Sequence, residues 1–564
     1  MITLVNYTFR LLLVFTLWLV QVQSATSQPS NIETNETLFI TTDRDIYIAG
    51  EELAVSLSIV GLDDSSETSG VGYILVRNQN QKVVQRATVR FLHGRSTCSI
   101  ELSDTLSSGY YQIVGFTNYL KNFGSNSFPS KQFVVVNRFD QEFISALSSS
   151  SNSIGIQNED DLTSKTNAPE YTTRQGVQFQ IETDSLPFNE IVSTSIVPKH
   201  FLLPPVNRPM KARGLYFERD NNGICYPKEK EGIYLSGSIR DLYTNTPIRG
   251  ATIYLSTPDS LINLQYTHSD SLGNFCFHLS FAYMGKNVLL MPDPSSYVGR
   301  VGLTLHHKFE LDDEFIPKSV TFSSDQANFI RTAQNVVLIQ KLFGTKYFIP
   351  NSNNRSVTQK LPRVYTSPSY TYLLSDYQEL DDFREIAREI IPQLRVRIRD
   401  TEALVSVMNT QESFNFFQNR PLMIINGMPF WDFSKVVRYG SKEIERIELV
   451  TLPWRFGEKL FHGIVAVFLK PNIDTQPLLP STRIEHFVDS FCKEIEYNHE
   501  VSEMKSIPDF RYVLHWQTNL TVDQNKPIDV SFNTSHIRGE YVIVLNGYDE
   551  KGRKASTTDR FFVK

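Results

Sequence analysis

His307 and Glu310 have the H-x-x-E spacing at which a histidine and a carboxylate can hold a zinc ion together. A catalytic zinc also needs a third protein ligand and a general base in context. Two ligands at this spacing occur easily by chance, and His307 simply continues the apolar strand expected at 301–305. We therefore expect no metal and no cofactor here. A zinc hydrolase using His307 and Glu310 is the least favoured function.

Other reactive patterns are absent from the sequence. It contains no H-E-x-x-H, G-x-S-x-G, P-loop or G-x-G-x-x-G motif. Cys98, Cys225, Cys276 and Cys492 lie far apart and form neither a C-x-x-C metal site nor a dense disulfide framework. We expect ordinary buried thiols, with one disulfide as the open alternative. The protein is predicted not to be an enzyme.

Composition describes a folded protein of several domains. The chain has 564 residues, with 41% hydrophobic and 21% charged side chains, and single cores stop growing at about 250–300 residues. The formal net charge is −6 and the isoelectric point is near 6.1. Because phosphate binding needs a basic field, nucleic acid is not expected as a partner.

The first residues have the features of a secretory leader. In the range 1–24, Arg10 precedes the apolar run Leu11–Val20, and Val22-Gln23-Ser24 follows before Ala25. That run is about ten residues long, whereas a membrane-spanning helix needs about 20. We expect signal-peptide cleavage near Ser24 and an exported protein of the periplasm or the outer-membrane surface, not itself membrane-spanning.

Residues 361–472 combine helix and strand patterns. An amphipathic helix is expected at 376–390 and a strand at 394–398. An apolar strand at 421–426 ends at Asn426-Gly427, a dipeptide suited to a turn. Residues 445–450 alternate charged and apolar side chains, whereas 464–469 are almost wholly apolar and should be buried on both faces.

The segments Leu422–Gly427, Ile444–Val450 and Gly463–Lys470 resemble the plug domain of TonB-dependent outer-membrane receptors. The resemblance implies an α+β plug-like domain over 361–472. A receptor barrel of about 22 strands would need more than about 200 residues, and only 94 follow Lys470. Transport by this chain alone is not expected.

The sequence of the N-terminal part predicts β-structure. Asp43-Arg44, Tyr47 and Gly50-Glu51 resemble the signature of a macroglobulin-type β-sandwich, expected over 37–140. A polar linker is expected at 141–166. Residues 167–231 are expected to form a second macroglobulin-like sandwich with an irregular excursion. The C-G-E-Q thioester of protease-trapping macroglobulins is absent.

Three further β segments complete the mainly β multidomain fold that we expect, with several immunoglobulin-like or macroglobulin-like sandwiches and one plug-like domain. The Gly237-x-Ile239-x-Asp241 pattern and the turn at Asp270–Gly273 resemble the carboxypeptidase-regulatory-like β-sandwich, expected over 232–318, which is a structural module. The remaining ranges are a helical connector at 319–360, a connector at 473–507 and a C-terminal β-sandwich at 508–564.

This order of modules resembles envelope proteins of Bacteroidota. It implies a non-enzymatic binding or scaffold protein that docks to an outer-membrane barrel, a transporter or an envelope assembly complex. The alternative is a macroglobulin-like protease-sensing or inhibitory protein without a thioester, with 145–166 as its only candidate bait segment.

Aromatic side chains crowd the plug-like range. Aromatic residues and arginine dominate interface hot spots, so a partner-binding patch is one reading and core packing is the other. The candidate partner-binding residues are Phe430, Trp431, Trp454, Arg455 and Phe456.

Overall fold

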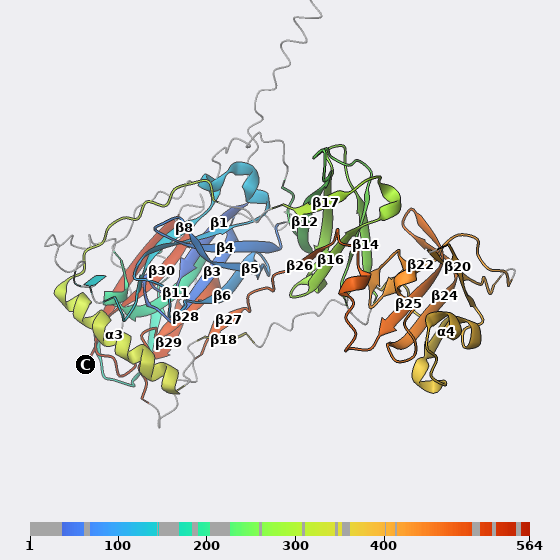
Figure 1. Ribbon diagram of the computed structural model, residues 1–564. Helices are drawn as coiled ribbons and strands as arrows, with labels where there is room; N and C mark the ends of the chain where they lie inside the picture. The colour runs from blue at the N-terminus through green and yellow to red at the C-terminus, as the bar shows by residue number, and fades with distance from the viewer. Residues whose placement is uncertain are drawn as a thin grey trace, which may run out of the picture. The chain divides into compact units, whose positions relative to one another are not determined.

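The computed structural model describes residues 36–60, 68–140, 142–143, 145, 169–182, 186, 190–203, 226–258, 262–306, 311–343, 348–351, 361, 363–400, 402–411, 414–498, 508–521, 526–548 and 554–564. The expected leader, His307, Glu310, Cys225 and nearly all of the linker at 141–166 lie outside these residues. The chain is mainly β and multidomain, and it divides into two compact units (Figure 1). Unit 1 comprises Met1–Lys228, Leu311–Asn351 and Lys493–Lys564, and unit 2 comprises Glu229–Glu310 and Ser352–Cys492.

The first sandwich of unit 1 is built from the N-terminal strands. One sheet has the order β1-β3-β6 and the other β2-β8-β7-β4-β5. Strand β7 is buried at every residue and β1 at every residue but the first, so both faces of these strands are covered. The strands are β1 (Thr37–Thr42), β2 (Ile46–Ile48), β3 (Glu52–Val60), β4 (Val71–Asn78), β5 (Val83–Arg90), β6 (Arg95–Glu101), β7 (Gly109–Phe116) and β8 (Ser130–Val136).

The second sandwich of unit 1 joins two distant ranges of the chain. Its sheets have the orders β28-β11-β30-β31-β9 and β10-β29. The strands are β9 (Glu170–Tyr171), β10 (Gly176–Ile181), β11 (Glu190–Pro198), β28 (His515–Thr521), β29 (Ile528–Asn533), β30 (Gly539–Tyr548) and β31 (Lys554–Val563).

This arrangement corrects the expectation of separate sandwiches at 167–231 and 508–564. Strand β11 pairs with β28 on one side and β30 on the other, and β10 pairs with β29. Neither range alone has enough strands to cover its apolar face, so each completes the other.

Helix α3 (Ser324–Phe343) confirms the helix expected in the 319–360 connector. Its buried residues, among them Ile330 and Val337, pack in one cluster with Ile48 and Val136 of the first sandwich and Tyr512 near the second. Strand β18 (Phe348–Pro350) then pairs with β27 (Ile495–Tyr497). The helix and this strand pair therefore belong to the packing of unit 1.

The macroglobulin-type signature forms a buried ionic network between β1, β2 and β3. Arg44 is 2% exposed. Its Nη2 lies 2.7 Å from Glu51 Oε2, and its Nη1 lies 3.2 Å from Asp43 Oδ2. Tyr47 Oη donates to Asp43 Oδ1 at 2.7 Å, and the Ala54 N–H donates to the same oxygen. Burial raises the pKa of both carboxyl groups, against the opposing effect of Arg44.

Unit 2 contains a third sandwich. One sheet has the order β15-β12-β17 and the other β14-β13-β16-β26. Strand β26 comes from the range expected to be a connector at 473–507, so that range contributes to the sandwich by pairing with β16. The strands are β12 (Gly232–Asp241), β13 (Thr252–Ser256), β14 (Leu264–His268), β15 (Asn274–Ser280), β16 (Asn287–Pro292), β17 (Val301–Leu305) and β26 (Ile484–Phe487).

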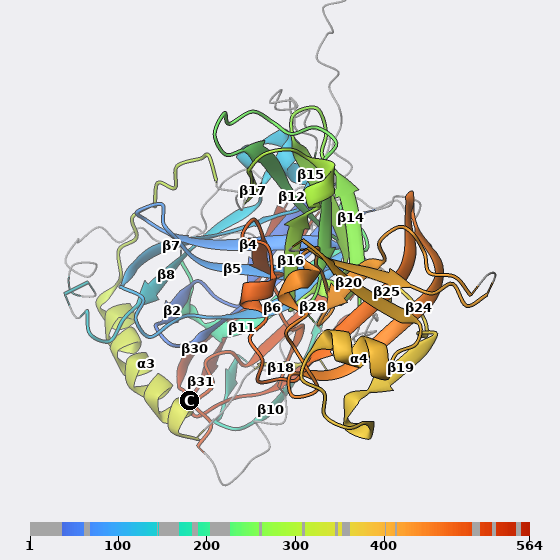
Figure 2. The same ribbon diagram turned by 45° about the vertical axis from the view of Figure 1, so that its right-hand side comes forward.

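Residues 361–472 of unit 2 are called the plug-like part after the expectation from the sequence. They contain a five-stranded sheet with the order β19-β24-β25-β22-β23 and a hairpin β20-β21. Figure 2 labels β19, β20, β24 and β25 beside helix α4. Helix α4 (Phe383–Glu389) begins later than the expected 376–390, because Asp382 caps it by accepting from the Glu385 N–H. The strands are β19 (Tyr370–Leu373), β20 (Leu394–Arg399), β21 (Glu402–Val407), β22 (Leu422–Ile425), β23 (Met428–Pro429), β24 (Ile444–Phe456) and β25 (Lys459–Leu469).

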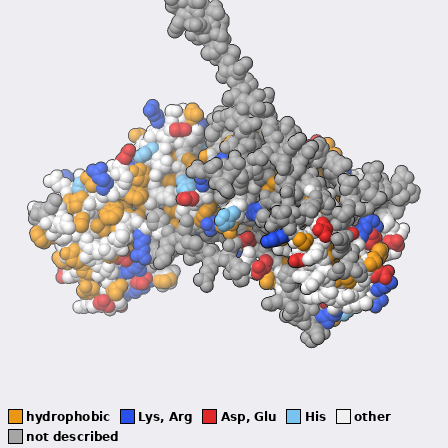
Figure 3. Space-filling view, turned by 180° about the vertical axis from the view of Figure 1, so that it is seen from behind, with side chains coloured by type: hydrophobic (Ala, Val, Ile, Leu, Met, Phe, Trp, Pro, Cys, Tyr) orange, Lys and Arg blue, Asp and Glu red, His pale blue; other side chains and the backbone are white. Residues whose placement is uncertain are grey.

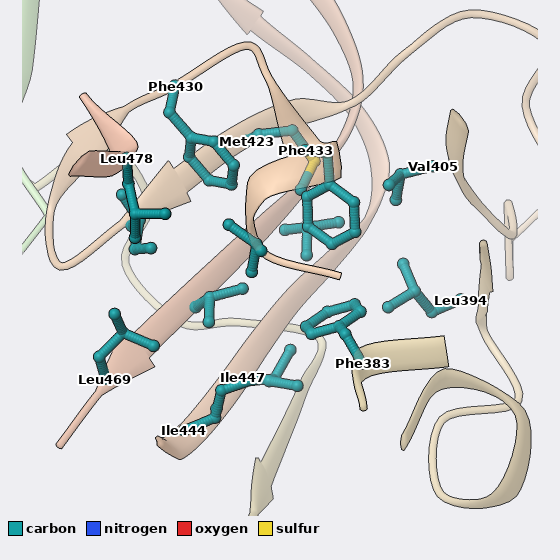
Figure 4. Close-up of a cluster of buried hydrophobic side chains, with 14 of the residues drawn as sticks. Phe383, Leu394, Val405, Met423, Phe430, Phe433, Ile444, Ile447, Leu469 and Leu478 are labelled. Atoms are coloured by element: carbon teal, nitrogen blue, oxygen red, sulfur yellow. The ribbon is translucent and has the colours of Figure 1, made fainter. Parts of the chain in front are cut away.

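Strand β25 is buried on both faces from Gly463 to Leu469, which confirms the expectation for 464–469. Val465, Val467 and Leu469 face one cluster, which also contains Phe383 and Phe433 (Figure 4). The alternate residues Ile464, Ala466 and Phe468 face a second cluster. A strand between two layers of side chains needs a continuous apolar sequence, which is what β25 has.

The surface carries mixed charge. Acidic and basic side chains are interspersed over the face seen in Figure 3, in keeping with the small net charge. Among the described residues, no helix is long and apolar enough to cross a membrane.

The Arg44 network makes a testable prediction. Replacing Arg44 by alanine leaves two buried carboxylates without their cation, so the free energy of unfolding should fall by about 3–5 kcal/mol near pH 7. Both carboxyl groups have raised pKa values when folded. Arg44 opposes this rise, so its removal raises both pKa values further. The folded variant therefore binds these protons at a higher pH than the folded wild type does, and the deficit should shrink as the pH falls from about 7 to about 4.5.

Urea denaturation followed by tryptophan fluorescence at the two pH values measures this difference. Arg44→Lys is the matched control, because it keeps the charge and loses the forked geometry. A deficit that is small, or that grows on acidification, would contradict the proposed electrostatic role.

Candidate protein-interaction surface

No group of three or more His, Cys, Asp or Glu side chains among the described residues could hold a metal ion. The predicted pair His307 and Glu310 lies outside the described residues. Of the cysteines, Cys98 is buried and Cys276 is an exposed free thiol.

Phe430 lies in the core of the plug-like part. It is 2% exposed, and its ring stacks on Phe433 with 6.0 Å between centroids. Figure 4 shows both rings beside Met423 in the same cluster. Phe430 therefore presents no surface to a partner in this structure, because its side chain already packs in the core.

Trp431, Trp454 and Phe456 are half-buried against the third sandwich. The Trp431 and Tyr254 ring centroids are 6.0 Å apart, and those of Phe456 and Tyr266 are 5.4 Å apart. Trp454 packs against the same cluster, to which Tyr254 belongs. These three aromatic side chains thus hold the plug-like part and the third sandwich together within unit 2.

The turn between β24 and β25 strengthens this contact. The Glu458 N–H donates to Tyr266 Oη at 2.8 Å, and Lys459 Nζ donates to Thr252 Oγ1 at 3.1 Å. Gly457 has φ +60°, and a Cβ there would lie 2.2 Å from Tyr266 Oη. Only glycine allows so close an approach. Of the five candidate residues, Arg455 alone is exposed, and its partner-binding role stays a prediction.

The hairpin β20-β21 presents a different surface, the arginine face. Strand alternation puts Arg395, Arg397 and Arg399 on one side and Leu394 and Val396 on the other. Leu394 is buried and Val396 packs against the core of Figure 4. The arginines consequently point away from the core, and Arg397 and Arg399 are exposed.

Arg395 is held in place by an aromatic ring. Its guanidinium carbon lies 3.6 Å from the centroid of Phe416, a cation–π contact that orients the group. Nearby in sequence, Phe414 is 69% exposed and has φ +51°, which is uncommon for a residue with a bulky side chain. Arginine and aromatic side chains thus meet at the solvent side of the hairpin.

A groove of about 490 Å³ lies beside the start of β20. Its lining includes Arg384, Arg388 and Arg395, with Glu385 and Phe416. Glu402, opposite Arg399, is paired with Arg420. Among the described residues, no carboxylate lies at ion-pair distance from Arg397 or Arg399. The arginine face therefore offers cations that an anionic partner could bind.

The sequence pattern predicted the strand at 394–398, but the arginine face was not predicted from it. The signal that could have found it is the alternation Arg-x-Arg-x-Arg within that strand. What the pattern could not show is that the apolar side chains of the strand face the core.

Comparisons with known proteins give a limited result. No protein-family model matches the chain, and no curated protein matches its sequence. Among solved structures, alignments cover most of the chain with a mutant Salmonella alpha-2-macroglobulin (8% identity, 94% of this chain, 40% of that chain, TM-score 0.23). For native Escherichia coli alpha-2-macroglobulin, the identity is 8% and the TM-score is 0.23, and the alignment covers 95% of this chain and 40% of that chain. For the Escherichia coli protein activated by elastase, the identity is 7% and the TM-score is 0.22, and the alignment covers 94% of this chain and 44% of that chain.

The chain therefore spans about two fifths of the length of these macroglobulins. TM-scores of 0.22 and 0.23 mean that the backbones do not superpose as one arrangement, so this likeness supports no statement about function.

The packing of the aromatic residues makes a second prediction. Trp431→Ala should lower the free energy of unfolding by about 2–4 kcal/mol, because it opens a cavity between two packed layers. Trp454 Nε1 is buried without an acceptor among the described residues. Trp454→Phe removes that N–H, and should leave stability within about 1 kcal/mol of the wild type or raise it slightly.

Thermal and urea denaturation of both variants measure these effects. Both variants lose one indole ring, so each variant is a control for the other. Unchanged stability in Trp431→Ala would reject the packing role and restore the partner-binding reading of this residue.

Proposed function

We propose that the protein is a non-catalytic docking protein that binds an extended acidic segment of a partner protein along strand β20. One observation carries the proposal: strand β20 has arginines at alternate positions, on the side that faces away from the core. Among the described residues, β20 pairs with β21 alone, so its second edge has no strand partner.

Strand geometry defines the occupant. Side chains two residues apart on a strand are about 6.7 Å apart, with the same orientation. A second strand added to the open edge of β20 would carry its own alternate side chains at the same spacing. Carboxylates at those positions would meet Arg395, Arg397 and Arg399 in register, and a guanidinium can bond a carboxylate through two N–H groups.

The groove beside the start of β20 extends this surface. Arg395 is already stacked on Phe416, so little side-chain entropy is lost when it binds a carboxylate. Arg384 and Arg388 line the groove with Glu385. Asp382 also lines the groove and is paired with Arg384, and Arg388 is paired with Glu389. An acidic segment that continues past the strand edge would therefore compete with these pairs for the two arginines.

The sequence supports a cell-envelope setting for this function. The leader pattern at 1–24 favours export, and the order of modules resembles envelope proteins of Bacteroidota. We propose an outer-membrane barrel or an envelope assembly complex as the partner, with the acidic segment belonging to it.

The alternative function is that of a protease-sensing or inhibitory protein. It requires cleavage within 145–166, followed by retention of the protease, and nearly all of that range lies outside the described residues. Incubation with a protease of broad specificity, followed by gel filtration, tests it. Co-elution of the protease with chain cut in this range would favour the inhibitor, whereas cleavage without retention would reject it.

Binding of a designed peptide tests the docking function directly. The probe is a synthetic fluorescent peptide in which glutamate alternates with valine, titrated with the full chain by fluorescence anisotropy. We expect binding that weakens as salt is added. Arg397→Glu/Arg399→Glu should weaken it by about tenfold or more, because two charge-assisted contacts become repulsive.

Matched controls separate charge from strand addition. Arg363→Glu/Arg438→Glu changes the charge of the plug-like part equally at other exposed positions, and should bind as the wild type does. A peptide with N-methyl groups on alternate backbone nitrogens keeps its carboxylates but cannot pair as a strand. Equal binding of the methylated peptide, or equal loss in both double variants, would overturn the proposal.

A further inference from the structure

Three loops of the third sandwich meet at one end of the sheet β15-β12-β17. Strand β12 ends at Asp241, which pairs with Val301 at the start of β17. Three residues earlier, Ser238 of β12 pairs with Asn274 at the start of β15. The loops at 242–251, 269–273 and 293–300 therefore lie together. Figures 1 and 2 show β12 and β17 side by side.

Backbone hydrogen bonds connect these loops. The Leu242 N–H donates to the Arg300 carbonyl at 2.9 Å, which joins the first loop to the third. The Ile239 N–H donates to the Gly273 carbonyl at 2.8 Å, which joins the first strand to the second loop. We call this end of the sandwich the loop tip.

The loop tip exposes large apolar side chains from all three loops. Leu242 is 63% exposed, Tyr243 76%, Leu272 63% and Val298 92%. Single exposed apolar residues are normal on a protein surface. Four of them gathered on adjacent loops mark a site of interaction.

Aspartate side chains hold the loops in shape. Asp241 Oδ1 accepts from the Tyr243 and Thr244 N–H groups, both at 2.8 Å. Asp270 Oδ1 accepts from the Leu272 and Asn274 N–H groups in the same way. The Thr244 and Tyr243 N–H groups also hold the pKa of Asp241 below its ordinary value. These carboxylates are therefore used internally, and the apolar side chains are displayed by turns that are already ordered.

Positive charge surrounds the apolar residues. Arg240, Arg249 and Arg300 are all exposed and lie in or next to the same loops. Arg240 Nη1 donates to the Asn245 carbonyl at 3.1 Å, which places its guanidinium over the first loop. The loop tip thus combines an apolar centre with three arginines and the two ionised carboxylates of Asp241 and Asp270, a net charge of +1 for these five groups (3 − 2).

We propose that the loop tip binds the surface of a membrane that contains anionic lipids. Leu242, Leu272 and Val298 enter the boundary between headgroups and acyl chains, and Tyr243 lies at headgroup level, where an aromatic ring with one polar end is stable. The three arginines bind lipid phosphates. This inference is independent of the acidic-segment site on β20.

The shape of the loop tip favours lipid over a protein partner. Its apolar side chains are 63–92% exposed and so project from the loops, whereas protein hot spots lie in well-packed interfaces of matching shape. A bilayer surface adapts to projecting side chains without a preformed pocket. Exposed arginines also complement the negative potential of anionic lipid headgroups.

Vesicle sedimentation with the purified full chain tests the proposal. The probes are vesicles of phosphatidylcholine alone and vesicles in which about one third is phosphatidylglycerol. We expect binding to the anionic vesicles that weakens with salt. Replacing Leu242, Tyr243, Leu272 and Val298 by serine should reduce binding by more than about a hundredfold. Replacing the three arginines by glutamine should cost about fivefold per residue and remove the preference for anionic lipid.

Two further measurements keep the result interpretable. Phe139→Ser/Ile316→Ser/Leu342→Ser removes exposed apolar side chains of unit 1, and should bind as the wild type does. Tyr243→Trp places a reporter at the loop tip, and its emission should shift to the blue and be quenched by brominated lipids. An unshifted emission, vesicle binding that survives the serine replacements, or no binding to either vesicle would overturn the proposal.

Discussion

The hydrogen bonds of strand β11 determine how the whole chain is arranged. Its backbone groups pair with β28 on one side and with β30 on the other, so it lies in the interior of a five-stranded sheet. A strand this deeply buried cannot leave its backbone groups unpaired away from water. The chain must therefore return to unit 1 after unit 2 is complete. Strands β26 and β27 lie on that return, and each pairs with a strand from before the plug-like part.

Local pattern predicted the elements well and their partners poorly. The strands β22 and β25 and the helix α3 could be predicted because turn residues and apolar periodicity lie within each segment. The union of 167–201 with 508–564 could not, because alternation shows that a strand has a buried face without showing which strand will pair with it. The late start of α4 has a local cause, the cap at Asp382, which competed with a longer amphipathic pattern.

The candidate site shows the same division. The sequence predicted either a partner-binding patch or core packing for the aromatic residues. In the structure, Phe430 packs in the core, and Trp431 and Phe456 pack between two layers of unit 2. Arginine has two opposite roles. Arg44 and Arg511 are buried, each bonded to an aspartate, whereas Arg397 and Arg399 are exposed on β20. Spacing alone cannot separate these roles, because burial depends on which surfaces the rest of the chain covers.

The split second sandwich has a consequence for synthesis. Asn546 Nδ2 donates to Ser193 Oγ across 353 positions of sequence. At about 5–20 residues per second, the ribosome needs tens of seconds to produce the strands that β11 requires. During that time β10 and β11 present open edges to any neighbouring chain, which invites aggregation. Folding of this half-sandwich must therefore wait until strands β28–β31 have been made.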